Sequence, residues 1–547
     1  MTRLTGGEAV VAALRAAGVR HVFGIVSVHN LPIYDALARD GSIEVVSVRH
    51  EQAAVHAADG YARATGELGV AIASTGPGTA NAVSGLYEAS VASSPVLLIT
   101  GQVASAHYGA DRGCFHEAER QLDLLGAVTR TTESVRRVED VGAAVLRVAA
   151  AVTAGRPQPG AVEIPIDVQQ AAADVSIPQP TLTPRLAPDP VLLQRAADAL
   201  AAARRPLLWA GGGVVTAGAS PALVELAERL AAPVVTTVQG RGSIPEDHPL
   251  ALGANAQAAA LADVLRRADV MLAVGTRFEE DETAGWTLPL PSRLVQLDAD
   301  PGAIGRSYAP ELALVGDACL GVAGILERLP PSNADPSYAE GARKAREEVE
   351  AEGRALIGRD HAAIMDAIRE LLPRSAIVVR DATVPAYMWG DRLLPIYEPR
   401  TSIWPTSGGI GPGLPLAIGA ALGTRLQTLV IQGDGGFMLN LGELATAVQH
   451  RVPVTICLFN DSGYGVLRTL QDRSTGRRIG VDLATPDFPA LARSFGIEAE
   501  AVTSAEAFRA ALERALGAGG PRLIEIDLAS LEPITISAAW STADESG

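Results

Sequence analysis

The stretch that decides the fold runs from 428 to 437 and reads Thr-Leu-Val-Ile-Gln-Gly-Asp-Gly-Gly-Phe. Its first four residues are an apolar run, which predicts a buried parallel strand that ends in a glycine-rich turn. A helical pattern follows at 441–450, and a second apolar run at 454–459 is followed at once by Asn-Asp. Because open α/β sheets bind ligands at the carboxyl ends of their strands, we expect Asp434 and Asp461 to face one binding site.

The chemistry of this turn favours a metal ion together with an anion. Asp434 and Asp461 offer hard oxygen ligands, and the amides of Gly435 and Gly436 can approach an anion closely. A Mg²⁺ ion that bridges carboxylates and a diphosphate suits this set of groups. The alternative is that the two aspartates only cap a helix and a loop, because Gly-Asp-Gly is also common turn chemistry.

Short apolar runs alternate with helical patterns through most of the chain. This alternation predicts an α/β fold of three consecutive doubly wound domains with mainly parallel sheets. The expected domains are 1–170, 191–330 and 361–547, with linkers at 171–190 and 331–360. The expected strands are 21–25, 43–48, 69–74, 96–100 and 160–165 in the first domain, 206–210, 234–237, 270–274 and 293–297 in the second, and 376–379, 428–431, 454–459 and 522–526 in the third.

The composition excludes several classes of function. The 547 residues include 45 Lys+Arg and 62 Asp+Glu, and the formal net charge of −17 argues against nucleic acid as a partner. The one lysine, Lys344, lies in a charge-rich helical stretch. A phosphate loop of the Walker type and a Schiff-base lysine are therefore both excluded.

The cysteines and the apolar runs bear on the location of the chain. Cys114, Cys319 and Cys457 lie far apart, which argues against a disulfide framework or a cysteine-rich zinc site and fits a reducing, cytoplasmic environment. The first residues contain no apolar signal core, and no stretch approaches 18 uninterrupted apolar residues. We therefore expect neither a membrane span nor a membrane partner.

Three further motifs stand at predicted strand-to-helix junctions. Glu51 follows the strand at 43–48 and begins an alanine-rich helix, where an acidic group is favourable for dipole reasons alone. Residues 74–81 read Ser-Thr-Gly-Pro-Gly-Thr-Ala-Asn, which alone could be any tight turn before a helix. Residues 406–415 read Thr-Ser-Gly-Gly-Ile-Gly-Pro-Gly-Leu-Pro, and such a loop can bring its backbone close to a flat or anionic group.

Together and in this order, the four motifs resemble the thiamine-diphosphate-dependent 2-oxo acid decarboxylase and carboligase family. That family includes acetolactate synthase, benzoylformate decarboxylase and benzaldehyde lyase. The resemblance extends over nearly the whole chain, because 239–249 and 295–301 look like the family's central domain. The spacing of Gly-Asp-Gly and Asn-Asp is its most specific part.

The resemblance implies a role for each motif. Glu51 matches the glutamate that hydrogen-bonds N1′ of the cofactor's aminopyrimidine ring. The carbonyl of Gly408 would hold the 4′-amine, and Ile410 would support the bent shape of the cofactor. Asp434, Asp461 and the carbonyl of Gly463 would bind Mg²⁺. The cofactor-binding residues implied in addition are Thr75, Asn81, Thr383, Gly435, Gly436 and Tyr464.

The resemblance also implies an oligomer. In this family two chains meet head to tail, and each supplies one half of each active site. Since Glu51 lies in the first predicted domain and Asp434 in the third, we expect a homodimer at minimum and a homotetramer as the complete assembly. The other expected partner is a small-molecule 2-oxo acid or aldehyde.

Two histidines join Glu51 as candidate catalytic residues. His29 falls where related lyases place a histidine that faces the substrate, although it could equally be a turn residue. His116 stands in place of a glutamine of acetolactate synthase and could relay protons near neutral pH. We expect this change to alter the reaction with a second substrate.

The predicted function is therefore that of a thiamine-diphosphate- and Mg²⁺-dependent enzyme that makes or breaks a C–C bond next to a carbonyl. We expect 2-oxo acid decarboxylation with or without carboligation, as in acetolactate synthase. The alternatives are a benzoylformate decarboxylase- or benzaldehyde lyase-like enzyme and, from another class, a non-catalytic cofactor-binding protein. FAD remains open but is not favoured, because Gly211-Gly212-Gly213 and Gly275 can serve packing alone.

Overall fold

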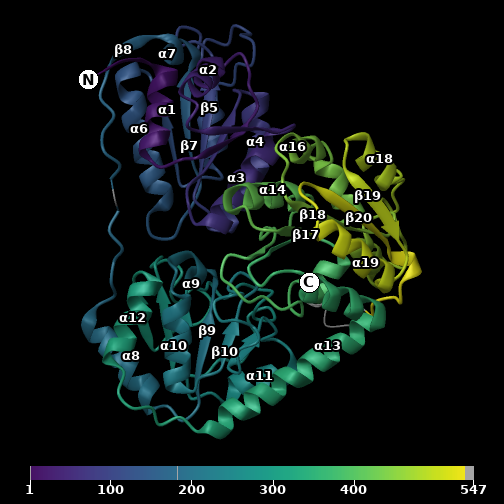
Figure 1. Ribbon diagram of the computed structural model, residues 1–547. Coiled ribbons are helices and arrows are strands. Elements are labelled where there is room, and N and C mark those ends of the chain that lie inside the picture. Colours follow the sequence, from purple (N-terminus) through teal and green to yellow (C-terminus); the bar gives the residue numbers. More distant parts are fainter. Residues whose placement is uncertain (1, 182, 536–547) are drawn as a thin grey trace.

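The computed structural model describes residues 2–181 and 183–535, and in it three six-stranded, wholly parallel sheets form three domains (Figure 1). The N-terminal domain lies at the upper left of Figure 1, the middle domain below it, and the C-terminal domain at the right. The predicted α/β fold with three doubly wound domains is confirmed. The last residues of the third predicted domain, 536–547, lie outside the described residues.

The N-terminal and C-terminal sheets share one strand order. The N-terminal order is β3-β2-β4-β5-β7-β6, and the C-terminal order is β16-β15-β17-β18-β20-β19. In both sheets the first and third strands of the domain lie side by side, which creates a switch point where loops diverge and ligands can enter. The strands are β2 (His21–Gly24), β3 (Glu44–Ser47), β4 (Gly69–Ala73), β5 (Val96–Gln102), β6 (Thr131–Ser134), β7 (Gly160–Pro165), β15 (Ile377–Arg380), β16 (Ser402–Ile403), β17 (Thr428–Gly433), β18 (Val454–Asn460), β19 (Glu498–Val502) and β20 (Arg522–Asp527).

The middle sheet has a different order, β11-β10-β9-β12-β13-β14, so its switch point lies between β9 and β12. Its strands are β9 (Pro206–Ala210), β10 (Val234–Thr236), β11 (Ala251–Gly253), β12 (Val270–Val274), β13 (Leu294–Asp298) and β14 (Leu312–Val315). Helices α8 (Pro190–Ala202), α9 (Gly212–Ala217), α10 (Ser220–Leu230), α11 (Ala259–Arg267) and α12 (Ala318–Arg328) cover it.

The connections between domains differ in kind. After β8 (Ala172–Val175), which pairs antiparallel with β1 (Thr2–Thr5), the described residues of the proline-rich segment contain no helix or strand until α8. The second connection is mostly helical, because α13 (Pro336–Leu371) runs from the middle domain to the C-terminal domain along the lower edge of Figure 1. Gly358 interrupts this helix with a φ of 77°.

The N-terminal and C-terminal domains share a single apolar core. Helices α3 (Glu51–Thr65) and α14 (Gly413–Thr424) cross at small residues, since a Cβ atom on Gly60 would collide with the carbonyl of Leu416 and one on Gly419 with that of Ala57. Buried side chains of both sheets continue this core without a break. The remaining helices of these domains are α1 (Gly6–Ala16), α2 (Leu31–Asp40), α4 (Pro77–Val91), α5 (Gln121–Gly126), α6 (Val138–Thr153), α7 (Ile166–Gln170), α15 (Asp434–Phe437), α16 (Glu443–Gln449), α17 (Gly465–Ser474), α18 (Phe488–Ser494) and α19 (Ala505–Leu516).

The sequence did not predict seven strands. Of these, β6, β11, β14, β16 and β19 lie at the edges of the six-stranded sheets, and β1 and β8 form a two-stranded sheet of their own. They are short or partly exposed, so they lack the continuous apolar run that marks a central parallel strand. In the described part of the chain, no helix combines the length and apolar character needed to cross a bilayer.

Candidate active site

Two aspartates lie at neighbouring strand ends of the C-terminal domain. Asp434 follows β17 as the first residue of α15, and Asp461 follows β18. Asp434 accepts hydrogen bonds from the amide of Gly463 at 2.8 Å and from the amide of Asp461 at 3.4 Å. The Nη1 atom of Arg468 lies 3.3 Å from the other carboxylate, at Asp461 Oδ2. The structure thus brings the three predicted metal ligands together.

The electrostatics of this pair fit a bound cation. Asp434 is 1% exposed, and burial, reinforced by the negative charge of Asp461, raises the pKa of its carboxyl group to about 6. A divalent cation would favour the charged form, so Mg²⁺ suits the donor set of two carboxylates and one carbonyl. Within residues 2–181 and 183–535, no cluster of three or more His, Cys, Asp or Glu side chains is placed to hold a metal.

The glycines of this turn touch other predicted site residues. A Cβ atom on Gly435 would lie 2.6 Å from the ring of Tyr464, and one on Gly433 would lie 2.9 Å from the hydroxyl oxygen of Thr383. Thr383 follows β15, the neighbour of β17, so these residues surround the switch point of the sheet. Gly436 packs against the loop that carries Gly408, because its Cβ would approach the amide of Gly411 to 3.3 Å.

The loop that carries Gly408 and Ile410 is held by Asp381, a residue that the sequence did not single out. The Asp381 carboxylate is buried directly after β15. It accepts hydrogen bonds from the amides of Gly411 at 2.9 Å and Gly413 at 3.1 Å, and from the side-chain amide of Gln432 at 2.6 Å. Gly408 and Gly411 adopt φ values of +74° and +99°, which favour glycine. The fixed loop leaves Ile410 37% exposed.

In the N-terminal domain, Glu51 and Asn81 are in direct contact. Glu51 is the first residue of α3, and the side-chain amide of Asn81 donates a hydrogen bond of 3.0 Å to its Oε2. The other oxygen faces Gly78, whose Cβ would lie 3.0 Å away. Thr75 begins the same turn and is buried, with its hydroxyl bonded to Gln121 at 2.8 Å. One glutamate oxygen is therefore held while the other remains available.

The two candidate histidines lie together at the same turn. The rings of His29 and His116 are 5.4 Å apart between centroids, and Phe115 stacks on His116 at 3.9 Å. The carbonyl of His116 faces Gly76, whose Cβ would come within 2.6 Å of it. In both histidines the Nδ1 atom is buried and has no hydrogen-bond partner among the described residues. Burial and, to a smaller degree, the charge of His116 lower the pKa of His29.

Among the described residues, the candidates in the N-terminal half of the predicted site make no polar contact with those in the C-terminal half. In the described part of the chain, no hydrogen bond or ion pair links Glu51, His29 or His116 to Asp434 or to Ile410. The turn before Glu51 does contact the C-terminal domain, because the amide of Arg49 donates to Glu443. This contact lies outside the predicted ligand set.

The glycines of the middle domain have a packing role. A Cβ on Gly211 would collide with the carbonyl of Gly275, and one on Gly213 would lie 2.6 Å from the Cα of Gly275. The amide of Gly213 also donates to the carbonyl of Gly275 at 3.0 Å. These glycines follow β9 and β12, so at this switch point the two loops touch each other.

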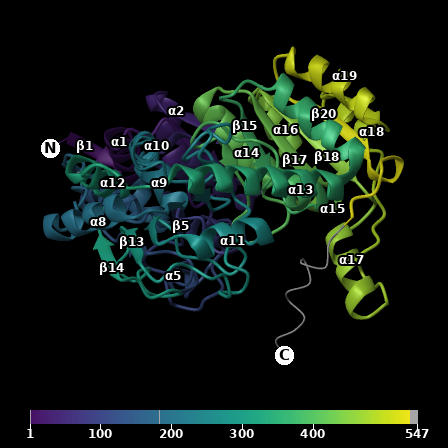
Figure 2. The ribbon, with the colours of Figure 1, turned by 90° about the horizontal axis from the view of Figure 1, so that it is seen from below.

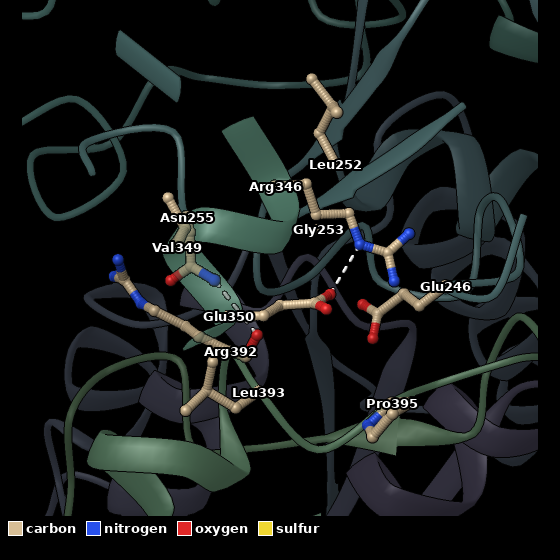
Figure 3. Close-up of a pocket in the computed structure, with 10 residues that line it drawn as sticks. All are labelled: Glu246, Leu252, Gly253, Asn255, Arg346, Val349, Glu350, Arg392, Leu393 and Pro395. Carbon is tan, nitrogen blue, oxygen red and sulfur yellow. Dashed lines mark hydrogen bonds and ion pairs between the residues drawn. The ribbon is translucent and has the colours of Figure 1, made fainter. Parts of the chain in front are cut away.

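A pocket between the middle domain, α13 and residues 392–395 contains none of the predicted site residues (Figure 3). Arg346 and Glu350, one turn apart on α13, form an ion pair of 2.6 Å at its wall, and the side chain of Asn255 donates to the carbonyl of Arg392 at 3.2 Å. Its volume of about 20 Å³ has room for roughly one water molecule. The charged groups that line it are therefore part of a domain junction.

Comparisons with known proteins agree with this architecture. Residues 4–125 match the N-terminal TPP binding domain of thiamine pyrophosphate enzymes, residues 193–325 match the central domain, and residues 384–526 match the C-terminal TPP binding domain. The chain is 37% identical to the probable 2-ketoarginine decarboxylase AruI of Pseudomonas aeruginosa over 530 residues, which is 96% of this chain and 94% of the relative.

Acetolactate synthases are also among its relatives. The chain is 33% identical to a probable acetolactate synthase large subunit of Methanocaldococcus jannaschii over 96% of this chain and 92% of the relative. It is 32% identical to the acetolactate synthase isozyme 2 large subunit of Escherichia coli, over 97% of each chain. Both kinds of relative match nearly from end to end.

Proposed function

Because the chain belongs to the thiamine-diphosphate-dependent 2-oxo acid decarboxylase and carboligase family, we propose that it decarboxylates a 2-oxo acid and then protonates the product or joins it to a second carbonyl compound. The chain is an enzyme of this family, so the non-catalytic alternative is set aside. The observation that carries the proposal is the pair of the buried Asp434 and the half-buried Asp461 beside the glycine-rich turn at the switch point. This pair supplies the negative charge that a Mg²⁺–diphosphate group requires.

The residues of the C-terminal domain would hold the diphosphate end of the cofactor. In our proposal Asp434, Asp461 and the carbonyl of Gly463 hold Mg²⁺, while the amides of Gly435 and Gly436 face the diphosphate. When bound, thiamine diphosphate supplies an electron sink in its thiazolium ring. The other cofactor contacts that we propose come from Thr75, Thr383, Gly408, Ile410 and Tyr464.

The residues of the N-terminal domain would transfer protons to and from the cofactor and the reacting group. Asn81 holds one oxygen of Glu51, which leaves the other to share a proton with the aminopyrimidine ring. Burial lowers the pKa of His29, which favours the neutral ring that can accept a proton. We propose that His29 and His116 together exchange protons with the reacting group.

The relatives support a 2-oxo acid as the donor that we propose. A 2-ketoarginine decarboxylase and an acetolactate synthase both begin by removing CO₂ from a 2-oxo acid, and they differ in what happens to the product. We favour decarboxylation as the shared step, with carboligation as the second candidate outcome. A benzoylformate decarboxylase- or benzaldehyde lyase-like reaction is the remaining alternative.

Exposed apolar side chains near the predicted site support the proposed head-to-tail homodimer, with a homotetramer as the complete assembly. Phe115 is 70% exposed beside the histidines. Helix α17 projects from the C-terminal domain (Figure 2), and the exposed Leu467 lies in it while the exposed Ile479 follows it. Large apolar groups that are exposed around a polar site are typical of a contact surface. We also propose a cytoplasmic location for the protein. The domain bounds that we propose are 1–170, 191–330 and 361–547.

The test is CO₂ release from a panel of 2-oxo acids that contains pyruvate, benzoylformate and 2-ketoarginine. We expect release from at least one donor, dependent on both thiamine diphosphate and Mg²⁺. A carboligation product on addition of an acceptor aldehyde or a second 2-oxo acid would select the second outcome. Cofactor binding without CO₂ release from any donor would contradict the proposal.

A further inference from the structure

Two buried glutamates cross the boundary between the N-terminal and C-terminal domains in opposite directions. Glu88 belongs to α4 of the N-terminal domain and contacts the loop of the C-terminal domain that carries Gly408 and Ile410. Glu443 belongs to α16 of the C-terminal domain and contacts the turn that leads into Glu51. Both side chains are 1% exposed. Each domain therefore places one carboxylate under a predicted cofactor-binding segment of the other.

Glu88 fixes the beginning of the loop. Its Oε1 accepts hydrogen bonds from the amide of Thr406 at 2.7 Å and from the hydroxyl of the same residue at 2.8 Å. Its Oε2 accepts from the amide of Ser407 at 2.9 Å. Since Asp381 holds the amides of Gly411 and Gly413, the loop is fixed on both sides of Ile410.

The groups that keep Glu88 ionised come from both domains at this boundary. Arg63 lies 2.5 Å from Glu88 and 2.6 Å from the buried Asp59, and it also donates to the carbonyl of Trp404 at 2.6 Å. Burial opposes ionisation, but the charge of Arg63 and the donors on Ser407 lower the pKa of Glu88 to about 2. Because two carboxylates share one guanidinium, the loop amides supply the donors that the second carboxylate needs.

Glu443 makes the corresponding contact in the other direction. Its Oε1 accepts from the amide of Arg49 at 2.9 Å, two residues before Glu51, and its Oε2 accepts from the hydroxyl of Thr446 at 2.6 Å. The side chain of Arg49 also reaches Gln449 on the same helix at 2.8 Å. The first turn of α3, and with it Glu51, is thus fixed to the C-terminal domain.

We propose that Glu88 and Glu443 are reciprocal positioning residues, each of which holds a cofactor-binding segment of the opposite domain in place for the reaction. This inference rests on the proposed cofactor site for its functional part. Neither residue touches the predicted ligand set directly, so both act through the backbone of the segments they hold. The geometry of each half-site is then fixed only when the two domains are docked.

The test compares Glu88→Gln and Glu443→Gln with Glu246→Gln as a matched control. Glu246 is also buried, binds Arg241 at 2.6 Å and accepts from the backbone amide of Ile396 at 2.9 Å, but it joins the middle domain to the C-terminal domain. In each variant the new NH₂ group faces a donor where the carboxylate accepted a hydrogen bond. The three substitutions therefore impose the same chemical change at three boundaries.

The first readout is amide hydrogen exchange of the cofactor-free protein. We expect faster exchange at 404–413 in Glu88→Gln and at 47–52 in Glu443→Gln, and neither change in Glu246→Gln. The second readout is calorimetric titration with thiamine diphosphate and Mg²⁺, where we expect about tenfold weaker binding in the first two variants and none of this loss in the control. Unchanged exchange at both segments, or equal changes in all three variants, would overturn the proposal.

Milder variants keep the test valid if a glutamine variant fails to fold. Thr406→Val removes one of the three loop donors to Glu88, and Thr446→Val removes one of the donors to Glu443. We expect the same local exchange changes at smaller amplitude, and their absence would count against the proposal. A wild-type protein that does not bind thiamine diphosphate would refute the proposed function, whereas the exchange readout would still decide the positioning contacts.

Discussion

The N-terminal and C-terminal domains differ from the middle domain at the switch points of their sheets, although each domain has six parallel strands. In the two outer domains buried polar side chains bind backbone amides of the ligand-bearing loops: Asp381 binds that of Gly411 in the C-terminal domain, and Gln121 binds that of Gly76 in the N-terminal domain. In the middle domain the corresponding loops touch each other through Gly211 and Gly275. Strand number and direction alone therefore do not create a site.

A switch point becomes a candidate site when side chains bind the backbone amides of its loops. The backbone amides of a loop need hydrogen-bond partners, and buried polar side chains supply them in the outer domains. Where glycines allow two loops to pack together, the same amides are satisfied locally, as Gly213 is by Gly275. We therefore expect substitutions at the ligand-bearing loops of the outer domains to affect cofactor binding, and those in the middle domain to leave it unchanged.

The largest effect is expected for the metal ligand. Asp434→Ala removes a carboxylate from the proposed Mg²⁺ site and should weaken Mg²⁺-dependent binding of thiamine diphosphate by about 100-fold or more. Asp298→Ala is the matched control, because Asp298 ends β13 of the middle domain and burial likewise raises its pKa to about 6. Calorimetric titration should show no loss of cofactor affinity in the control. An equal loss of affinity in both variants would contradict a cofactor site confined to the outer domains.

The next effect concerns turnover. Glu51→Gln keeps the shape of the side chain and its contact with Asn81 but removes the shared proton, so we expect kcat to fall by about 100-fold or more. Cofactor affinity should stay within a few-fold of the wild-type value. Steady-state CO₂ release and calorimetry on the same preparation separate the two, and wild-type turnover would show that Glu51 has another role.

A smaller effect is expected where a carboxylate holds a loop. Asp381→Asn turns an NH₂ group either toward the amides of Gly411 and Ala382 or toward the amide of Gly413 and the side chain of Gln432. We expect the free energy of unfolding to fall by about 1–3 kcal/mol and cofactor binding to weaken with it. Denaturant titration checks the first effect. Stability equal to wild type would mean that the loop does not depend on this carboxylate.

The smallest effect is expected in the middle domain, where the free energy of unfolding should depend on pH through Glu282. Burial raises the pKa of Glu282 to about 7, against 4.5 for an unperturbed glutamate. Between these values the folded chain binds more protons than the unfolded chain, so the free energy of unfolding decreases as the pH rises from about 4.5 to about 7.

Glu282→Gln keeps an oxygen for the amide of Val238, which the carboxylate accepts at 2.7 Å, and removes the titrating proton. Thermal unfolding should be unchanged at pH 5 and shifted to higher temperature at pH 8, with cofactor binding unaffected at both. A Tm difference between variant and wild type that does not vary with pH would refute this assignment.

The sequence predicted the central strands and the ligand-bearing turns for a physical reason. Buried parallel strands are continuous apolar runs. Turns such as Gly-Asp-Gly-Gly at 433–436 combine a carboxylate with glycine amides, a set of groups that suits a metal ion and an anion. Edge strands such as β16, with two residues, lack this signal. Asp381 could have been found from its place two residues after the predicted strand 376–379. Glu88 could not, because its partners at 406 and 407 are far away in the sequence.

The most direct test of a site made jointly by the N-terminal and C-terminal domains uses Glu51→Gln and Asp434→Ala together. Each variant alone should be nearly inactive. When two differently tagged chains are co-expressed, about half of the dimers carry one copy of each, and each mixed dimer has one intact site if the halves come from different chains. We predict recovery of about a quarter of the wild-type CO₂ release; mixed dimers that form and remain inactive would contradict the shared site.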